Sequence, residues 1–281
     1  WCNRFLLHKK SPEGVIFSDS DELEGRFPAG KYNLSTNVLA YASFLYGSKL
    51  AAALSKTDLA KEWKKEAQKL KNNIERYFGA SVEGYNTYRY YDGNNKLRSW
   101  ICLPLVMGIN DRKEQTQAAL LSPKLWTPNG LLTESGSTTF WDRSTLYAFR
   151  GLLKAGATDT ALSYLSYYSA QRLLGEHVPY AIEAWPEGNQ RHLSAESGLY
   201  CRALVEGAFG FEPVGVKEFM ICPKLPRGWD HMSLKNIYAF NTRFDINVRR
   251  AGGKYQVTVK EENKPAKVVN WNGEKAFAVQ L

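Results

Sequence analysis

The strongest structural signal in this chain is the helical pattern of residues 57–77, TDLAKEWKKEAQKLKNNIERY. Apolar side chains recur there every three or four positions, which is the spacing of one face of an α-helix. Thr57 is the expected N-cap and Gly79 the expected stop. The pattern therefore predicts an amphipathic helix whose apolar face, with Trp63, lies in a core.

Helical spacing also occurs on both sides of this segment. Further helices are expected at residues 35–54, just after Asp111, at Asp142–Lys154, at Thr158–Leu174, and from Ser194 to about Gly207–Gly210. Glu114 lies three residues after Asp111, the spacing of a capping box. About seven helices, paired by short turns, are thus expected before Pro213.

After residue 213 the apolar period changes from about 3.6 to about 2. Residues 238–249 alternate apolar and polar side chains and predict one half-buried strand. Ala251-Gly252-Gly253 is expected to turn this strand into the next, and Asn272-Gly273 to form another hairpin. The chain is therefore predicted to be mainly α at residues 1–212, followed by a small antiparallel β domain, a sandwich or part of one, at 213–281.

Composition excludes several classes of protein. The net charge of +9 is spread without long runs of like charge, so it favours solubility and no nucleic-acid partner is expected. No apolar run approaches the roughly 18–20 residues of a membrane span. The four cysteines lack CxxC spacing, and no glycine-rich nucleotide motif occurs, so neither structural zinc nor a nucleotide cofactor is implied. No other metal is implied; calcium in the carboxylate-rich loops is the one alternative.

One loop places carboxylates among aromatic side chains just before the Ser194 helix. Glu183 and Glu187 lie there with Tyr180, Trp185 and Pro186. Aromatic faces suit pyranose rings, and partial desolvation tunes the pKa of a carboxyl group. This combination is typical of a sugar-cleaving site.

A second acidic cluster, Asp19–Arg26, holds Asp21, Glu22 and Glu24. Cleavage of a glycosidic bond needs one acid for the leaving oxygen and one carboxylate as base or nucleophile. The alternative interpretation is structural. A glutamate beside a loop proline is commonly solvated or paired with an arginine such as Arg191, and acids at a helix start compensate its dipole.

Three segments carry a resemblance to a known superfamily. The string HVPYAIEAWPEGNQRHLSAESGLYCRALVEGAFG (His177–Gly210) resembles the last helix pair of six-hairpin (α/α)6-toroid glycoside hydrolases of the glucoamylase-like and mannosylglycerate-hydrolase-like types. The resemblance implies that Glu183 is the general base. TTFWDRSTLYAFRGLLKAG (Thr138–Gly156) resembles the preceding segment, whose Trp and Arg line the sugar pocket.

That second segment implies Trp141 and Arg143 as substrate-binding residues, with Asp142 beside them. SDSDELEGRFPAG (Ser18–Gly30) is similar, more loosely, to the general-acid loop of these enzymes, where Asp21, Glu22 and Glu24 are equal candidates. The arrangement of a small β domain after the toroid resembles that of α-L-rhamnosidase-like proteins.

Together these observations predict a glycoside hydrolase that acts on oligo- or polysaccharides with a paired-carboxylate, inverting mechanism. The sugar would be held by Tyr180, Trp185, Glu187 and His192 together with the three residues at 141–143. Because a toroid has six hairpins, the chain is expected to be the C-terminal portion of a longer protein. The missing N-terminal half is then its expected partner, beside the carbohydrate substrate.

Two other functions are compatible with the sequence. A toroidal polysaccharide lyase acting on uronates would use Tyr or His as its base, although only four His residues are present. A glycan-binding protein on the same scaffold would bind sugars without cleaving them. A secreted or periplasmic location is expected for a polysaccharide-degrading enzyme, with the cytoplasm as the alternative.

Overall fold

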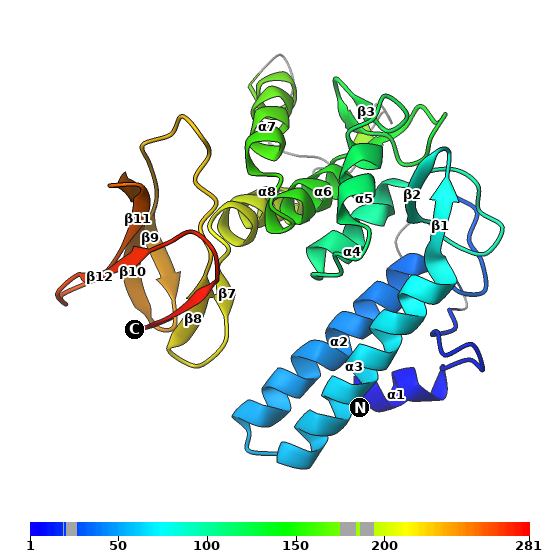
Figure 1. Ribbon diagram of the computed structural model, residues 1–281, viewed down its shortest axis with the longest axis horizontal. Helices are drawn as coiled ribbons and strands as arrows, with labels where there is room; N and C mark the ends of the chain where they lie inside the picture. The colour runs from blue at the N-terminus through cyan, green and yellow to red at the C-terminus, as the bar shows by residue number, and fades with distance from the viewer. Residues whose placement is uncertain (19, 21–26, 175–183, 186–193) are drawn as a thin grey trace.

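We describe the fold from a computed structural model of the 281-residue chain. The structure describes residues 1–18, 20, 27–174, 184–185 and 194–281. Helices make up most of the chain up to residue 208, and antiparallel sheets follow at one end of the molecule (Figure 1). The predicted order, mainly α and then antiparallel β, is confirmed.

The helical part contains α-helices, one 3₁₀ turn and one π-helical turn. They are α1 (Cys2–His8), α2 (Leu34–Ala53), α3 (Thr57–Phe78), η1 (Ser99–Ile101), α4 (Cys102–Val106), α5 (Lys113–Leu120), α6 (Asp142–Lys154), α7 (Thr158–Arg172), α8 (Ser194–Arg202) and η2 (Ala203–Ala208). Over the described ranges, none of these helices combines the length and apolarity needed to cross a bilayer.

The long helices α2 and α3 lie side by side as an antiparallel pair (Figure 1). Trp63 of α3 is buried and stacks on Phe44 of α2 with ring centroids 5.8 Å apart, as the apolar pattern predicts. The helix ends at Phe78, before Gly79, but its N-cap is Lys56 rather than Thr57. The apolar spacing therefore located this helix to within one residue.

The predicted capping box at Asp111 is wrong. Helix α5 begins at Lys113 with Arg112 as N-cap, and no side-chain hydrogen bond caps it. Asp111 instead pairs with Lys71 of α3, 3.0 Å away. An ion pair to a neighbouring helix has replaced the local bond that the spacing suggested.

Short strand pairs connect the helices, and longer strands form two sheets at the C-terminal end. The strands are β1 (Gly79–Val82), β2 (Tyr85–Tyr88), β3 (Trp126–Thr127), β4 (Gly130–Leu131), β5 (Phe140–Trp141), β6 (Ala184–Trp185), β7 (Glu212–Pro213), β8 (Glu218–Ile221), β9 (His231–Ala239), β10 (Thr242–Ala251), β11 (Lys254–Glu261), β12 (Lys267–Trp271) and β13 (Phe277–Gln280). The sheets have the orders β12-β11-β10-β9 and β13-β8-β7. The ring centroids of Phe219 in β8 and Phe244 in β10 lie 5.6 Å apart, so the two sheets share an apolar core.

The single strand predicted over residues 238–249 is wrong. Phe240 and Asn241 both adopt positive φ, +55° and +58°, and form a two-residue turn between β9 and β10. After such a turn, the chain runs back beside β9, and the positions that face the core no longer follow the alternation of the preceding strand. Tyr238 pairs with Arg243 and is 71 % exposed, whereas Phe244 is buried. The unbroken alternation of apolar residues concealed the turn.

The hairpin predicted at Asn272-Gly273 is also wrong, while the one at Ala251-Gly252-Gly253 is confirmed by the pairing of Ala251 with Lys254. After Gly273 the chain does not return along β12. Strand β13 pairs with β8 in the other sheet. The turn at Asn272-Gly273 thus carries the chain from one sheet to the other.

Gly210 joins the helical part to the sheets and yields a testable prediction. Its φ is +61°, and a Cβ there would lie 2.5 Å from the carbonyl oxygen of Cys222. Gly156 has φ +94° but open space around it. Replacement of Gly156 by Ala should lower the free energy of unfolding by about 1–2 kcal/mol through backbone strain alone.

Replacement of Gly210 by Ala should cost at least about 1 kcal/mol more, because backbone atoms must also move apart. Urea unfolding of both variants measures the difference. Equal losses at Gly210 and Gly156 would mean that the contact with Cys222 imposes no constraint.

Candidate functional site

Strands β5 and β6 bring together two segments that lie far apart in the sequence. Phe140 pairs with Trp185, and Trp141 pairs with Ala184, in an antiparallel ladder. This ladder immediately precedes the N-terminus of α6. The two segments that resemble glycoside hydrolases, 138–156 and 177–210, therefore meet at one place.

The segment that follows the second acidic cluster is attached to the buried side chain of Arg98. The Arg98 guanidinium donates to the carbonyl oxygen of Pro28 (3.1 Å) and lies 5.0 Å from the ring centroid of Phe27. Glu134 pairs with the same guanidinium at 3.4 Å. Residues 27 and 28 are therefore fixed by a fully buried cation.

Backbone pairings connect Arg98 to the β5–β6 ladder. Arg98 bridges to Glu134, Leu132 bridges to Phe140, and Phe140 pairs with Trp185. Each of these three lateral steps spans about 5 Å. The described anchors of both acidic loops thus lie on one continuous set of paired segments.

Arg143, in the first turn of α6, is held by a buried carboxylate. Its Nε donates to Glu196 Oε1 of α8 at 2.8 Å, and Glu196 is completely buried. The guanidinium also lies 5.7 Å from the ring centroid of Trp141. Within the described chain, Glu196 Oε2 is buried without a hydrogen-bond partner, so this carboxylate keeps unused acceptor capacity.

Glu196 is a site residue that the sequence reasoning missed. Its only signal was an acidic residue in the first turn of a predicted helix, which is usually attributed to the helix dipole. Its burial and its arginine partner depend on the packing of α8 against α6. Nothing in the local spacing of residues 194–202 reveals that contact.

Asp142 forms a buried ion pair with Arg172 of α7. Oδ1 lies 3.0 Å from Nη1, and Nη2 donates to Oδ2 at 3.1 Å. The side chains are 1 % and 3 % exposed. Arg172 also donates to the carbonyl oxygen of Asn129 at 2.8 Å. Asp142 therefore holds the end of α7 against the start of α6, next to Arg143.

A buried phenol lies beside this pair. Tyr168 of α7 is fully buried, and its ring centroid lies 5.9 Å from the Arg172 guanidinium. Desolvation, with the nearby Asp142 carboxylate, raises the pKa of Tyr168 well above its ordinary value. The Tyr168 phenol therefore holds its proton more firmly than an exposed tyrosine does.

Trp141, which the resemblance implies as a substrate-binding residue, lies largely inside the protein. It belongs to β5, and its side chain is 8 % exposed within the core. Its Nε1 is buried and has no hydrogen-bond partner in the described part of the chain. Its substrate-binding role stays a prediction, for which the indole N–H could serve as a hydrogen-bond donor.

The remaining predicted site residues lie outside the described residues or are described only in their backbone. Asp21, Glu22, Glu24, Tyr180, Glu183, Glu187 and His192 belong to the first group, and Trp185 to the second. Among residues that are described, no group of three His, Cys, Asp or Glu side chains could hold a metal ion. Of the candidate site, the structure therefore describes chiefly the two ion pairs at the start of α6, Arg143–Glu196 and Asp142–Arg172.

Comparison with known proteins adds information on the fold. No protein-family model matches the sequence, and no curated protein matches it either. A solved structure titled sialidase superposes with a TM-score of 0.71 at 15 % identity, over 92 % of this chain and 28 % of that one. An α-L-rhamnosidase from Dictyoglumus thermophilum gives 0.56 at 14 % identity, over 98 % and 35 %.

A neutral trehalase from Saccharomyces cerevisiae gives a TM-score of 0.50 at 14 % identity, over 62 % of this chain and 37 % of that one. The chain thus spans between 28 % and 37 % of the length of these three proteins. Identity at this level is evidence of fold, not of activity. The chain therefore shares an α/α-toroid fold with these proteins and comprises part of the toroid and the antiparallel sheets that follow it.

Proposed function

We propose that this protein is an inverting glycoside hydrolase with Glu183 as general base. Asp21, Glu22 or Glu24 would be the general acid. The acid protonates the glycosidic oxygen as the bond to the anomeric carbon breaks, and Glu183 takes a proton from the water that attacks the opposite face. Carboxyl groups about 6.5–9.5 Å apart leave room for that water.

The pairing of β5 with β6 is the observation that supports this proposal most directly. Ala184 follows Glu183 in the sequence and lies opposite Trp141 in the ladder. Trp141 directly precedes Asp142, the first residue of α6, so the residue that follows Glu183 in the sequence lies beside the start of that helix. A base attached to paired strands is positioned more firmly than one on an isolated loop.

Arg143 is the described side chain best placed to bind a sugar. It is 25 % exposed, and its Nε bond to the buried Glu196 fixes the plane of the guanidinium. An arginine held in this way presents a rigid set of donors to hydroxyl or carboxylate oxygens. Trp141, Asp142, Tyr180, Trp185, Glu187 and His192 complete the proposed binding residues, on the resemblance described above.

A substrate panel tests this proposal. The neighbours' names suggest sialosides, α-L-rhamnosides and trehalose as first substrates. Hydrolysis with an inverted anomer, followed by ¹H NMR before mutarotation, is the expected result. A retained anomer would contradict the inverting mechanism, since it requires carboxyl groups only about 5–5.5 Å apart.

The same assay separates the two other functions. Ultraviolet absorbance from an unsaturated uronide would identify a lyase, and binding of glycans without release of reducing ends would identify a non-catalytic protein. We further propose that this protein, acting on oligo- or polysaccharides, is secreted or periplasmic. Fractionation of the source cells tests that location.

A further inference from the structure

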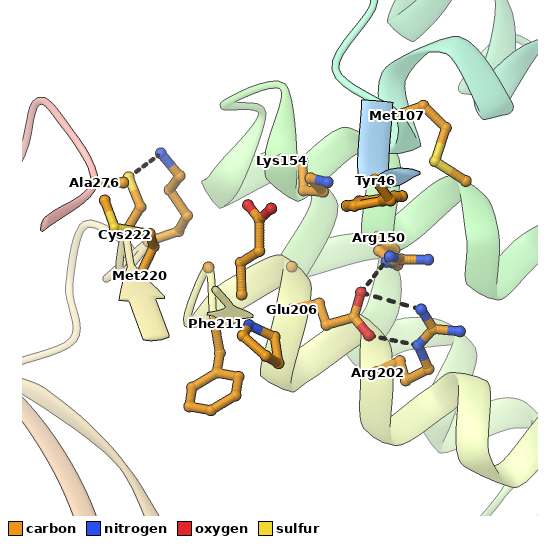
Figure 2. Close-up of a pocket in the computed structure, with 15 residues that line it drawn as sticks. Tyr46, Met107, Arg150, Lys154, Arg202, Glu206, Phe211, Met220, Cys222 and Ala276 are labelled. Carbon is orange, nitrogen blue, oxygen red and sulfur yellow. Dashed lines mark hydrogen bonds and ion pairs between the residues drawn. The ribbon is translucent and has the colours of Figure 1, made fainter. Parts of the chain in front are cut away.

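A cavity of about 400 Å³ lies where the helices meet the first strands of the sheets (Figure 2). Arg150 and Lys154 of α6, Glu206 of η2 and Glu212 of β7 are among its lining residues. Lys154 lies twelve residues after Asp142 in the same helix, or about 18 Å along its axis. The cavity is therefore separate from the candidate active site.

Its cationic side chains have donor capacity that the described part of the chain leaves unused. Arg150 is 5 % exposed, and its Nε is buried without a hydrogen-bond partner in the described ranges. Lys154 Nζ makes one hydrogen bond there, to the carbonyl oxygen of Val106 at 2.7 Å. Lys224 Nζ lies 3.4 Å from Cys222 Sγ, which is a weak acceptor.

Two carboxylates share the same cavity. Glu206 lies between the guanidinium groups of Arg150 and Arg202 and pairs with both (Figure 2). Glu212 pairs with Lys49 at 2.5 Å. With the cations Arg150, Lys154, Arg202 and Lys224, the lining carries four positive and two negative charges, a net of +2.

This mixture of groups suits one kind of ligand. The surplus cations attract an acid, the carboxylates can accept hydrogen bonds from hydroxyl groups, and Tyr46 also lines the same space. We propose that the cavity binds a small hydroxylated organic acid, of the sugar-acid class, with its carboxylate near Lys154 and Lys224. This proposal does not depend on the catalytic one.

Lys154 offers a clean test, because its charge is costly to the folded protein. Burial and the nearby Arg150 guanidinium lower the pKa of the Lys154 ammonium group. Lys154→Met removes the charge and keeps an apolar stem of similar length. We therefore expect the variant to fold, and urea unfolding checks this before any binding measurement.

Calorimetric titration with D-glucuronate is the binding experiment, with D-glucose and acetate as controls that lack the acid or the hydroxyls. Glucuronate should bind to the unaltered protein, and neither control should bind comparably. Lys154→Met should weaken glucuronate binding at least tenfold, and Lys224→Met should also weaken it. Lys64→Met, on the exposed face of α3, should leave it unchanged.

Three results would overturn the proposal. They are no glucuronate binding to the unaltered protein, equal binding of acetate or glucose, and undiminished binding in both the Lys154 and Lys224 variants. None of these results bears on hydrolysis, which is measured separately with the substrate panel. A Lys154→Met protein that loses glucuronate binding but keeps its hydrolytic activity would show that the glucuronate site is distinct from the catalytic site with Glu183.

Discussion

Replacement of Glu183 by Gln should lower kcat for glycoside hydrolysis by about 10²–10⁴-fold. A glutamine amide cannot take the proton from the attacking water, but it has nearly the same size as the carboxyl group. The low-pH limb of the rate profile should disappear with the activity, because that limb reports ionisation of the base. Initial rates across a pH series, measured on the best substrate of the panel, provide the test.

Glu114→Gln is the matched control for this substitution. Glu114 lies on α5 and its side chain is 73 % exposed, so the same chemical change should leave kcat unaltered. A Glu183→Gln protein that hydrolyses substrate at the original rate would eliminate Glu183 as base. A loss of activity shared by the Glu114 variant would indicate a general effect of the substitution.

The general acid can be identified with three further variants, Asp21→Asn, Glu22→Gln and Glu24→Gln. The true acid should be needed for substrates whose leaving group requires a proton. It should matter much less for an aryl glycoside whose phenolate leaves unaided. Only one of the three variants should show this split between substrates, and none showing it would remove the cluster at 21–24 from the mechanism.

Breaking the Asp142–Arg172 ion pair should produce a large loss of stability. Asp142→Asn or Arg172→Met alone should lower the free energy of unfolding by about 3–5 kcal/mol, because each leaves a charge buried without its partner. The pair is bidentate and almost completely buried, which excludes water from the remaining charge. Urea unfolding followed by circular dichroism measures the change.

A double-mutant cycle separates the pair from its surroundings. The double variant should recover much of the stability lost by either single variant, since no unpaired charge remains. Lys71→Met, which breaks the more exposed pair with Asp111, is the control and should change stability by less than about 1 kcal/mol. Additive losses in the double variant would show that Asp142 and Arg172 act independently.

The sequence predicted the long helices well because their side-chain periodicity is local. Helix α6 begins at Asp142 and ends at Lys154, as expected, and α7 ends at Arg172, two residues before the predicted Leu174. The turn at Phe240-Asn241 was missed because alternation on both sides of it looks like a single strand. A phenylalanine with positive φ is tolerated there because its ring packs against Phe219 at 6.1 Å.

The candidate site was predicted in part. The sequence singled out residues 141–143 and the neighbourhood of 183–185, and the structure places Trp141 opposite Ala184. The sequence did not predict that Arg143 pairs with Glu196, nor that Asp142 pairs with Arg172. Those partners lie 53 and 30 residues away, so no short-range spacing could indicate them.

By itself, then, the sequence determined the helical and strand periods, the change between them near residue 213, and the two acidic loops that suggest sugar chemistry. These features follow from neighbouring residues and need no partner elsewhere in the chain. Only the tertiary structure decided which charges are buried together at the start of α6 and which line the cavity at its other end. Burial and pairing depend on contacts between distant segments, and these contacts exist only after the helices have packed.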